Sequence, residues 1–128
     1  MQKQAILIVE DTRDILDVLC MLLEQEGYEV YKAESCAAAF EVLSENHIDL
    51  IITDLMLPGM TGLEFIHKVR RVVNYDLIPV VAMSAFDHKY LSAAAQAGAT
   101  RILHKPEDLD QLVPIVQQLM HHNVADFH

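Results

Sequence analysis

The residues of this chain that could do chemistry gather directly after short apolar runs. Such runs are typical of strands buried in a parallel sheet, and ligands bind beyond the carboxyl ends of those strands. The residues are three carboxylates, one hydroxyl and one amine: Glu10, Asp11, Asp54, Ser84 and Lys105. A carboxylate can act as a nucleophile toward phosphorus and form an aspartyl phosphate. A nearby ammonium and hydroxyl can then contact the transferred oxygens.

The net negative charge of these five residues suggests that they bind a cation. Crowded carboxylates repel one another unless positive charge joins them, and Lys105 is the only cation among the five residues. A hard divalent cation would balance the rest, and Mg²⁺ takes carboxylate oxygens while keeping several waters. Asp11 or Ser84 alone could instead cap a helix, as these residue types often do after strands. Caps do not explain the complete set, so the sequence predicts Mg²⁺ beside a nucleophilic Asp54.

The apolar pattern predicts the elements that must hold these groups. Apolar runs predict buried strands, and apolar residues that recur at helical spacing predict helices between them. Because strands and helices alternate five times, we expect an α/β fold, a doubly wound five-stranded parallel sheet with helices on both faces. The predicted strands are 5–9, 28–33, 49–53, 77–83 and 100–104, and the predicted helices are one that ends near Gly27, 35–45, 63–73, 87–97 and one from 109. Pro114 falls within the last of these, so that helix is expected to start late or to bend.

Length, charge and cysteine content exclude several classes of protein. The 128 residues suffice for one domain, predicted at 1–121 and followed by a tail at 122–128. A formal net charge of −10 argues against direct binding to nucleic acid or to an anionic membrane, because both rely on Lys and Arg. No apolar run approaches the roughly 20 residues of a membrane span and no signal peptide is visible, so we expect a cytoplasmic protein. Cys20 and Cys36 are expected to be buried, reduced thiols.

Four short motifs give the chain a family resemblance. They are LIVED at 7–11, IITDLMLPGMTG around Asp54, VAMSA at 81–85 and LHKP at 103–106. In this order and at strand ends, they resemble the receiver domain of response regulators in two-component signalling. The resemblance covers about residues 4–121 and implies flavodoxin-like topology.

The resemblance also implies roles for individual residues. Asp54 is the implied phosphoacceptor, and Glu10, Asp11, Asp54 and the backbone carbonyl of Met56 are the implied Mg²⁺ ligands. Ser84 and Lys105 take the switch and phosphate-contact roles. The implied partners are a histidine kinase or phosphotransfer protein, which donates the phosphoryl group, and a downstream target protein. The Lys105–Pro106 bond resembles one that is usually cis in the family.

Two positions depart from the family pattern, and two others are expected to affect how fast the phosphoryl group is hydrolysed. Glu10 stands where Asp is usual, and Ile102 stands where the switch usually has an aromatic ring. The resemblance also implies that the residues two positions after Asp54 and Ser84 flank the path of the hydrolytic water, and here these are Met56 and Phe86. Both are bulky and neither can orient a water, so the sequence predicts a long-lived phosphoryl group.

Other functions of an α/β fold fit these residues less well or stay open. A phosphohydrolase commonly has a general acid at the position of Met56, which cannot transfer a proton. A flavin carrier needs a phosphate cradle after the first strand, where Glu10 and Asp11 would repel phosphate. A receiver-like module that docks without phosphorylation stays open, as does a receiver excised from a larger regulator or hybrid kinase. The predicted helices show no obvious aromatic anchor for a homodimer, so a monomer is expected.

Overall fold

The five predicted strands form one parallel sheet in the computed structural model, which describes residues 3–85, 88–105 and 108–125. Their order is β2-β1-β3-β4-β5, so the chain winds first to one side of β1 and then to the other. This is the doubly wound, flavodoxin-like topology that was expected, with its switch point between β1 and β3. The strands are β1 (Ala5–Val9), β2 (Glu29–Ala33), β3 (Leu50–Asp54), β4 (Val80–Ser84) and β5 (Arg101–His104).

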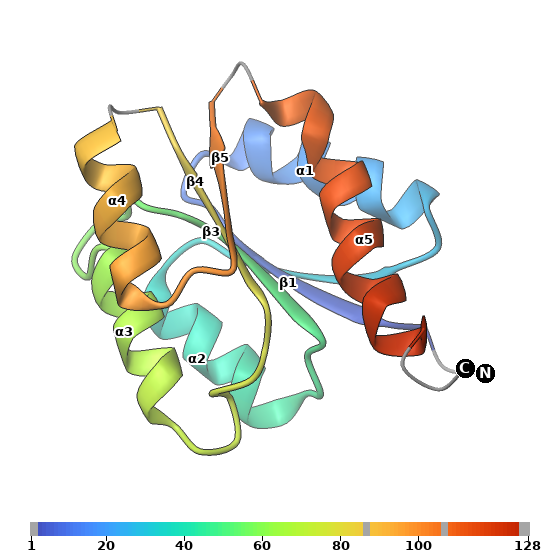
Figure 1. Ribbon diagram of the computed structural model, residues 1–128, viewed down its shortest axis with the longest axis horizontal. Coiled ribbons are helices and arrows are strands. Elements are labelled where there is room, and N and C mark those ends of the chain that lie inside the picture. The colour runs from blue at the N-terminus through green and yellow to red at the C-terminus, as the bar shows by residue number, and fades with distance from the viewer. Residues whose placement is uncertain (1–2, 86–87, 106–107, 126–128) are drawn as a thin grey trace.

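The helices cover the sheet in two layers (Figure 1). Helices α1 and α5 lie on one face, and α2, α3 and α4 lie on the other. Their bounds are α1 (Arg13–Gln25), α2 (Cys36–Glu45), α3 (Gly62–Arg71), α4 (His88–Ala97) and α5 (Leu112–Ala125), with a 3₁₀ turn η1 (Leu109–Gln111) before α5. No helix in the described part of the chain is long and apolar enough to cross a membrane.

Alternate residues of each strand supply two separate cores. In β1, Leu7 and Val9 pack toward α2 and α3, whereas Ile6 and Ile8 pack toward α1 and α5. Every residue of β1, β3 and β4 is buried, as continuous apolar runs of a covered parallel sheet require. The central strands are therefore held rigidly from both faces, and so are the residues at their ends.

The fourth strand begins later than the sequence predicted. It starts at Val80 rather than at residue 77, and Leu77 is 89% exposed. Two of the preceding carbonyls are bound by a side chain instead of a neighbouring strand, because the guanidinium of Arg70 donates to the carbonyls of Asp76 and Ile78 at 3.1 and 2.6 Å. The strand predicted from apolar character alone therefore began three residues too early.

The C-terminal helix resolves the question raised by its proline. Helix α5 begins at Leu112, so Pro114 lies in its first turn, where a backbone N–H has no partner within the helix. The late start is therefore the correct alternative. The helix continues through Ala125, beyond the domain boundary predicted at 121, and 126–128 lie outside the described residues.

Candidate functional site

The carboxyl ends of β1 and β3 place two acidic side chains next to each other. Val9 pairs with Thr53 in the sheet, so Glu10 and Asp54, the next residue of each chain segment, stand side by side. Glu10 is fully buried and Asp54 is only 6% exposed, whereas Asp11 is exposed. Two carboxylates are thus buried at the carboxyl ends of the strands, and the third lies beside them at the surface.

Lys105 bridges the two buried carboxylates. It follows β5 directly, and its Nζ donates to Oε1 of Glu10 at 3.0 Å and to Oδ2 of Asp54 at 2.9 Å. Its side chain is only 12% exposed. Charged hydrogen bonds in such shielded surroundings are stronger than those at an open surface. Lys105 therefore fixes the distance between β1, β3 and β5 at their carboxyl ends.

Backbone amides orient the remaining carboxylate oxygens. The N–H of Thr12 donates to Oε2 of Glu10 at 3.1 Å, and the N–H of Met56 donates to Oδ1 of Asp54 at 3.0 Å. Each carboxylate thus has one oxygen on Lys105 and the other on the loop that follows its own strand. Both groups are preorganised before any ligand binds.

Burial and charge act in opposite directions on the ionisable groups. Burial raises the pKa of Glu10 above its ordinary value, and the nearby charge of Asp54 adds to that effect. Burial alone would lower the pKa of Lys105, but its hydrogen bonds to Asp54 and Glu10 and the negative charges of these two groups together raise the pKa. Lys105 therefore stays protonated at neutral pH and supplies the positive charge that Asp54 needs.

The three carboxylates fit a hard divalent cation. One oxygen from each of Glu10, Asp11 and Asp54 lies within 4.8 Å of the others. The donors are all carboxylate oxygens, which suit Mg²⁺, and Asp11 opens the cluster to solvent. Glu10 and Asp54 already accept hydrogen bonds at both oxygens, and Glu10 is also fully buried, so its carboxylate is the least accessible of the three.

A glycine sets the position of the loop after Asp54. The N–H of Gly62 donates to the carbonyl of Leu55 at 2.9 Å. A Cβ at position 62 would clash with the Asp54 carbonyl oxygen and would lie 2.6 Å from the Leu55 Cα. Sequence reasoning missed this role, although a glycine that opens a helix after a strand was a signal of close backbone approach.

The other predicted site residues occupy different surroundings. Ser84 ends β4 and is fully buried, and its carbonyl accepts from the backbone N–H of Lys105 at 2.7 Å. The Met56 side chain is 41% exposed, and a role for its carbonyl on a metal stays a prediction. Ile102 is half-buried and packs into the core that faces α2, α3 and α4. Phe86 and Pro106 lie outside the described residues.

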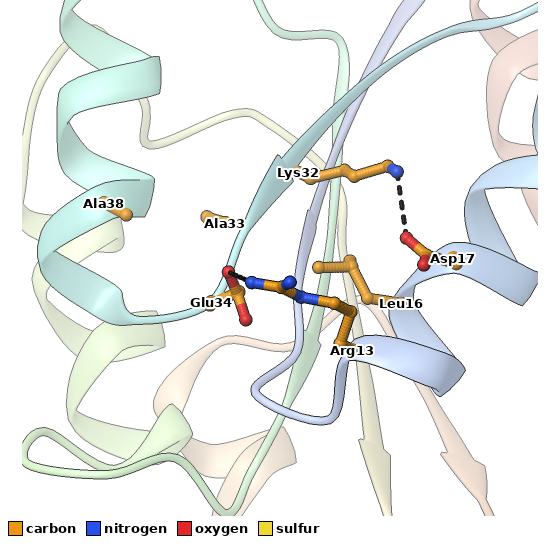
Figure 2. A pocket seen from close by; sticks show the side chains of 7 residues that line it. All are labelled: Arg13, Leu16, Asp17, Lys32, Ala33, Glu34 and Ala38. Atoms are coloured by element: carbon orange, nitrogen blue, oxygen red, sulfur yellow. Dashed lines mark hydrogen bonds and ion pairs between the residues drawn. The ribbon is translucent and has the colours of Figure 1, made fainter.

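One cavity of the described residues lies away from the acidic cluster. It has a volume of about 480 Å³ and lies at the β2 edge between α1 and α2 (Figure 2). Two ion pairs line it, Arg13 with Glu34 at 3.4 Å and Lys32 with Asp17 at 3.0 Å. All four side chains are at least half exposed, so these pairs are of the weak surface kind. The buried carboxylates and Lys105 are the stronger candidate for chemistry.

Comparison with known proteins identifies the family. A model of the response regulator receiver domain matches residues 6–117. The chain is 35% identical over 116 residues to the phosphate regulon transcriptional regulatory protein PhoB of Klebsiella pneumoniae. That match covers 90% of this chain and 51% of the relative, so the chain spans about half the length of the PhoB proteins it matches.

Solved structures agree with this family. The chemotaxis response regulator CheY4 of Vibrio cholerae is similar with a TM-score of 0.85 at 28% identity, over 92% of this chain and 99% of that one. The response regulator TrrA of Thermotoga maritima, in complex with Mg²⁺ and BeF, is similar with a TM-score of 0.80 at 28% identity, over 91% of this chain and 98% of that one. With the family match over residues 6–117, this chain belongs to the response regulator receiver domains of two-component systems.

Proposed function

We propose that Asp54 accepts a phosphoryl group from the phosphohistidine of a partner histidine kinase or phosphotransfer protein. The observation that carries this proposal is the contact of one largely shielded ammonium, that of Lys105, with both Asp54 and Glu10 at the switch point of the sheet. Receiver domains as a family interact with such donors and bind Mg²⁺ at an acidic pocket. The site here has the residues that this chemistry requires.

The proposed step is a phosphoryl transfer. A carboxylate oxygen of Asp54 forms the new bond to phosphorus, and the bond between phosphorus and the donor imidazole nitrogen breaks. The bonding electrons stay on the imidazole nitrogen, which is then free to take up a proton. Lys105 moves its charge from the Asp54 oxygen toward an oxygen of the transferred group. The Ser84 hydroxyl is proposed to donate to another of those oxygens.

Glu10, Asp11 and Asp54 would hold Mg²⁺, together with the proposed Met56 carbonyl. When bound, this ion supplies positive charge that offsets the carboxylates and the phosphoryl oxygens. The remaining orientation comes from the chain itself, through the backbone N–H groups of Thr12 and Met56 and the Lys105 ammonium.

The acetyl phosphate reaction tests the proposed function. The wild-type chain, incubated with Mg²⁺ and acetyl phosphate, should gain the mass of one phosphoryl group, and EDTA should prevent the gain. If the chain takes up no phosphate from this donor or from a phosphorylated kinase, a docking module that works without phosphorylation becomes the better account. Half-buried Ile102, in place of a switch aromatic, is the observation that favours that second account.

An apolar face of α1 is the proposed contact for the protein donor. Val18, Met21 and Leu22 are 54%, 57% and 40% exposed, which is unusual for large apolar side chains on one helix. Leu109, which begins η1, lines a shallow groove together with α1. Helix α1 starts two residues after Asp11, so a donor helix seated there lies beside the acidic cluster.

Replacing Leu22 with Glu should separate the protein donor from the small donor. A charge on this apolar face should slow transfer from a phosphorylated kinase that labels the wild-type chain by about tenfold or more, as loss of an interface anchor does. Labelling by acetyl phosphate should not change, since that donor needs no docking. Val73→Glu is the matched control, because Val73 is 84% exposed in the segment that follows α3. Equal slowing by the two variants would contradict the assignment of the α1 face.

Met56 and Phe86 are proposed to prolong the life of the phosphoryl group. Met56 is exposed beside Asp54, as a residue that blocks an approaching water must be. Met56→Asn with Phe86→Glu should shorten the phosphoryl lifetime by about tenfold or more, and by more than either change alone, because both new side chains can orient a water. Release of inorganic phosphate from the labelled chain measures this lifetime. Met21→Asn is the control, because it makes the same change at an exposed side chain of α1. A double variant that releases phosphate as slowly as the parent would refute the blocking idea.

The proposal also covers the compartment, the oligomeric state and the partners of the protein. Cys20 and Cys36 are free, buried and placed in the two different cores, so they cannot pair with each other, which supports the cytoplasm as the compartment. The unphosphorylated chain is proposed to be a monomer that does not bind nucleic acid directly. Its phosphorylated surface is proposed to recruit a target protein. Light scattering after size-exclusion chromatography tests the monomer.

A further inference from the structure

Two hydrogen bonds join His104, the residue before Lys105, to Asp108. The backbone N–H of His104 donates to Oδ2 of Asp108 at 3.0 Å, and the backbone N–H of Asp108 donates to the carbonyl of His104 at 2.8 Å. Lys105 follows His104 directly. Both bonds therefore restrain the backbone from which the Lys105 side chain extends.

The Asp108 side chain serves this segment rather than the helix that follows. Asp108 occupies the position before η1, where an aspartate ordinarily caps the first turn. Its carboxylate accepts no hydrogen bond from that turn. It turns back to the end of β5 instead, so the helix start does not account for an acidic residue here.

A second strand restrains Lys105 from the other side. The N–H of Lys105 donates to the carbonyl of Ser84 at 2.7 Å, which continues the pairing of β5 with β4 by one residue. The Lys105 backbone is thus held between β4 and the Asp108 clasp. Its Nζ must reach Glu10 and Asp54 across 3.0 and 2.9 Å, and a long side chain holds such a position only if its base is fixed.

We propose that Asp108 is a positioning residue for phosphoryl transfer to Asp54, and that it acts through Lys105. Its carboxylate holds the His104 N–H, which fixes the Lys105 backbone and so aims the ammonium at the Asp54 oxygen. This inference rests on the proposed function of Asp54. It adds to that function a residue outside the acidic cluster and outside the motifs of the sequence.

The test compares four proteins in one labelling reaction: the wild type, Asp108→Ala, Asp108→Asn and Asp110→Ala. Initial rates of phosphoryl gain from acetyl phosphate with Mg²⁺ are measured by intact mass, well below the thermal midpoint of each protein. Asp110 is exposed in η1, so Asp110→Ala removes the same charge from the same segment without touching His104. Asp108→Asn keeps an acceptor oxygen for the His104 N–H. Hydrogen exchange of the His104 amide, without Mg²⁺ or donor, is the second readout.

Asp108→Ala should lower the labelling rate by about fivefold, the effect of one lost hydrogen bond on a positioned group. Asp108→Asn should stay within about twofold of wild type and Asp110→Ala should not change, since both keep the bond to His104. The His104 amide should exchange faster in Asp108→Ala alone. If that variant does not fold, Asp108→Ser replaces it, because serine can cap the helix but is one bond too short to hold His104.

Each of three results would overturn this inference and leave the proposed function standing. They are wild-type labelling by Asp108→Ala, equal slowing by Asp108→Asn, and unchanged exchange of the His104 amide. A wild-type chain that gains no phosphoryl group overturns the proposed function itself and the inference with it.

Discussion

Replacing Asp54 with Asn will reduce phosphorylation by acetyl phosphate to background. The change keeps the shape of the side chain and an acceptor for the N–H of Met56, but it removes the nucleophilic carboxylate. The variant should still fold, because Lys105 keeps its contact with Glu10 at 3.0 Å. Intact mass with and without Mg²⁺ measures the result.

Asp49→Asn is the matched control for that experiment. Asp49 lies just before the opposite end of the same strand, where one of its oxygens accepts from the backbone N–H of Ala5 at 2.8 Å. It should be labelled as fast as the wild type. A phosphoryl gain by Asp54→Asn that equals the wild-type gain would show that another residue accepts the phosphate.

Replacing Gly62 with Ala will destabilise the fold by about 3 kcal/mol, as overpacking against atoms that cannot rotate away does. The added Cβ would meet the backbone of Asp54 and Leu55, and not the end of a flexible side chain. Relief of that clash should also displace the loop that carries Met56. Urea unfolding followed by circular dichroism gives the free energy, and acetyl phosphate labelling should be slower as well.

Gly59→Ala separates a clash from a simple loss of glycine. Gly59 has a φ of +79° and nothing within 4 Å of its missing Cβ, so alanine there has only the cost of a left-handed backbone. That cost is about 1–2 kcal/mol, smaller than the expected effect at Gly62. Unfolding of Gly62→Ala at the same urea concentration as the wild type would contradict the close approach of α3 to β3.

The sequence predicted the meeting of the acidic residues because strand ends are easy to recognise. Continuous apolar runs end at Glu10 and next to Asp54, and parallel strands bring their carboxyl ends to one edge of a sheet. The same logic predicted Lys105 at that edge. The parallel sheet with helices on both faces, which the alternation of strands and helices predicted, is confirmed. The flavodoxin-like strand order, which the family resemblance implied, is confirmed as well.

What the sequence could not predict depends on side chains that reach across the fold. Arg70 binds the carbonyls before β4, so Leu77 lies in a turn although its neighbours resemble a strand. Glu10 was expected to face a metal, and its contact with Lys105 spans 95 positions of sequence. The clasp of Asp108 on His104 is a bond from a side chain back to the backbone at the end of β5, which no apolar pattern encodes.

The most direct measurement of the central claim is to locate the phosphoryl group on the chain. The wild-type protein is labelled with acetyl phosphate and Mg²⁺ and then treated with borohydride, which reduces an aspartyl phosphate to homoserine and releases phosphate. Peptide mass spectrometry then reads each position. We predict homoserine at position 54, absent without donor or Mg²⁺ and absent in Asp54→Asn. Homoserine at another aspartate, or a phosphate on a serine or histidine with position 54 unchanged, would contradict the account.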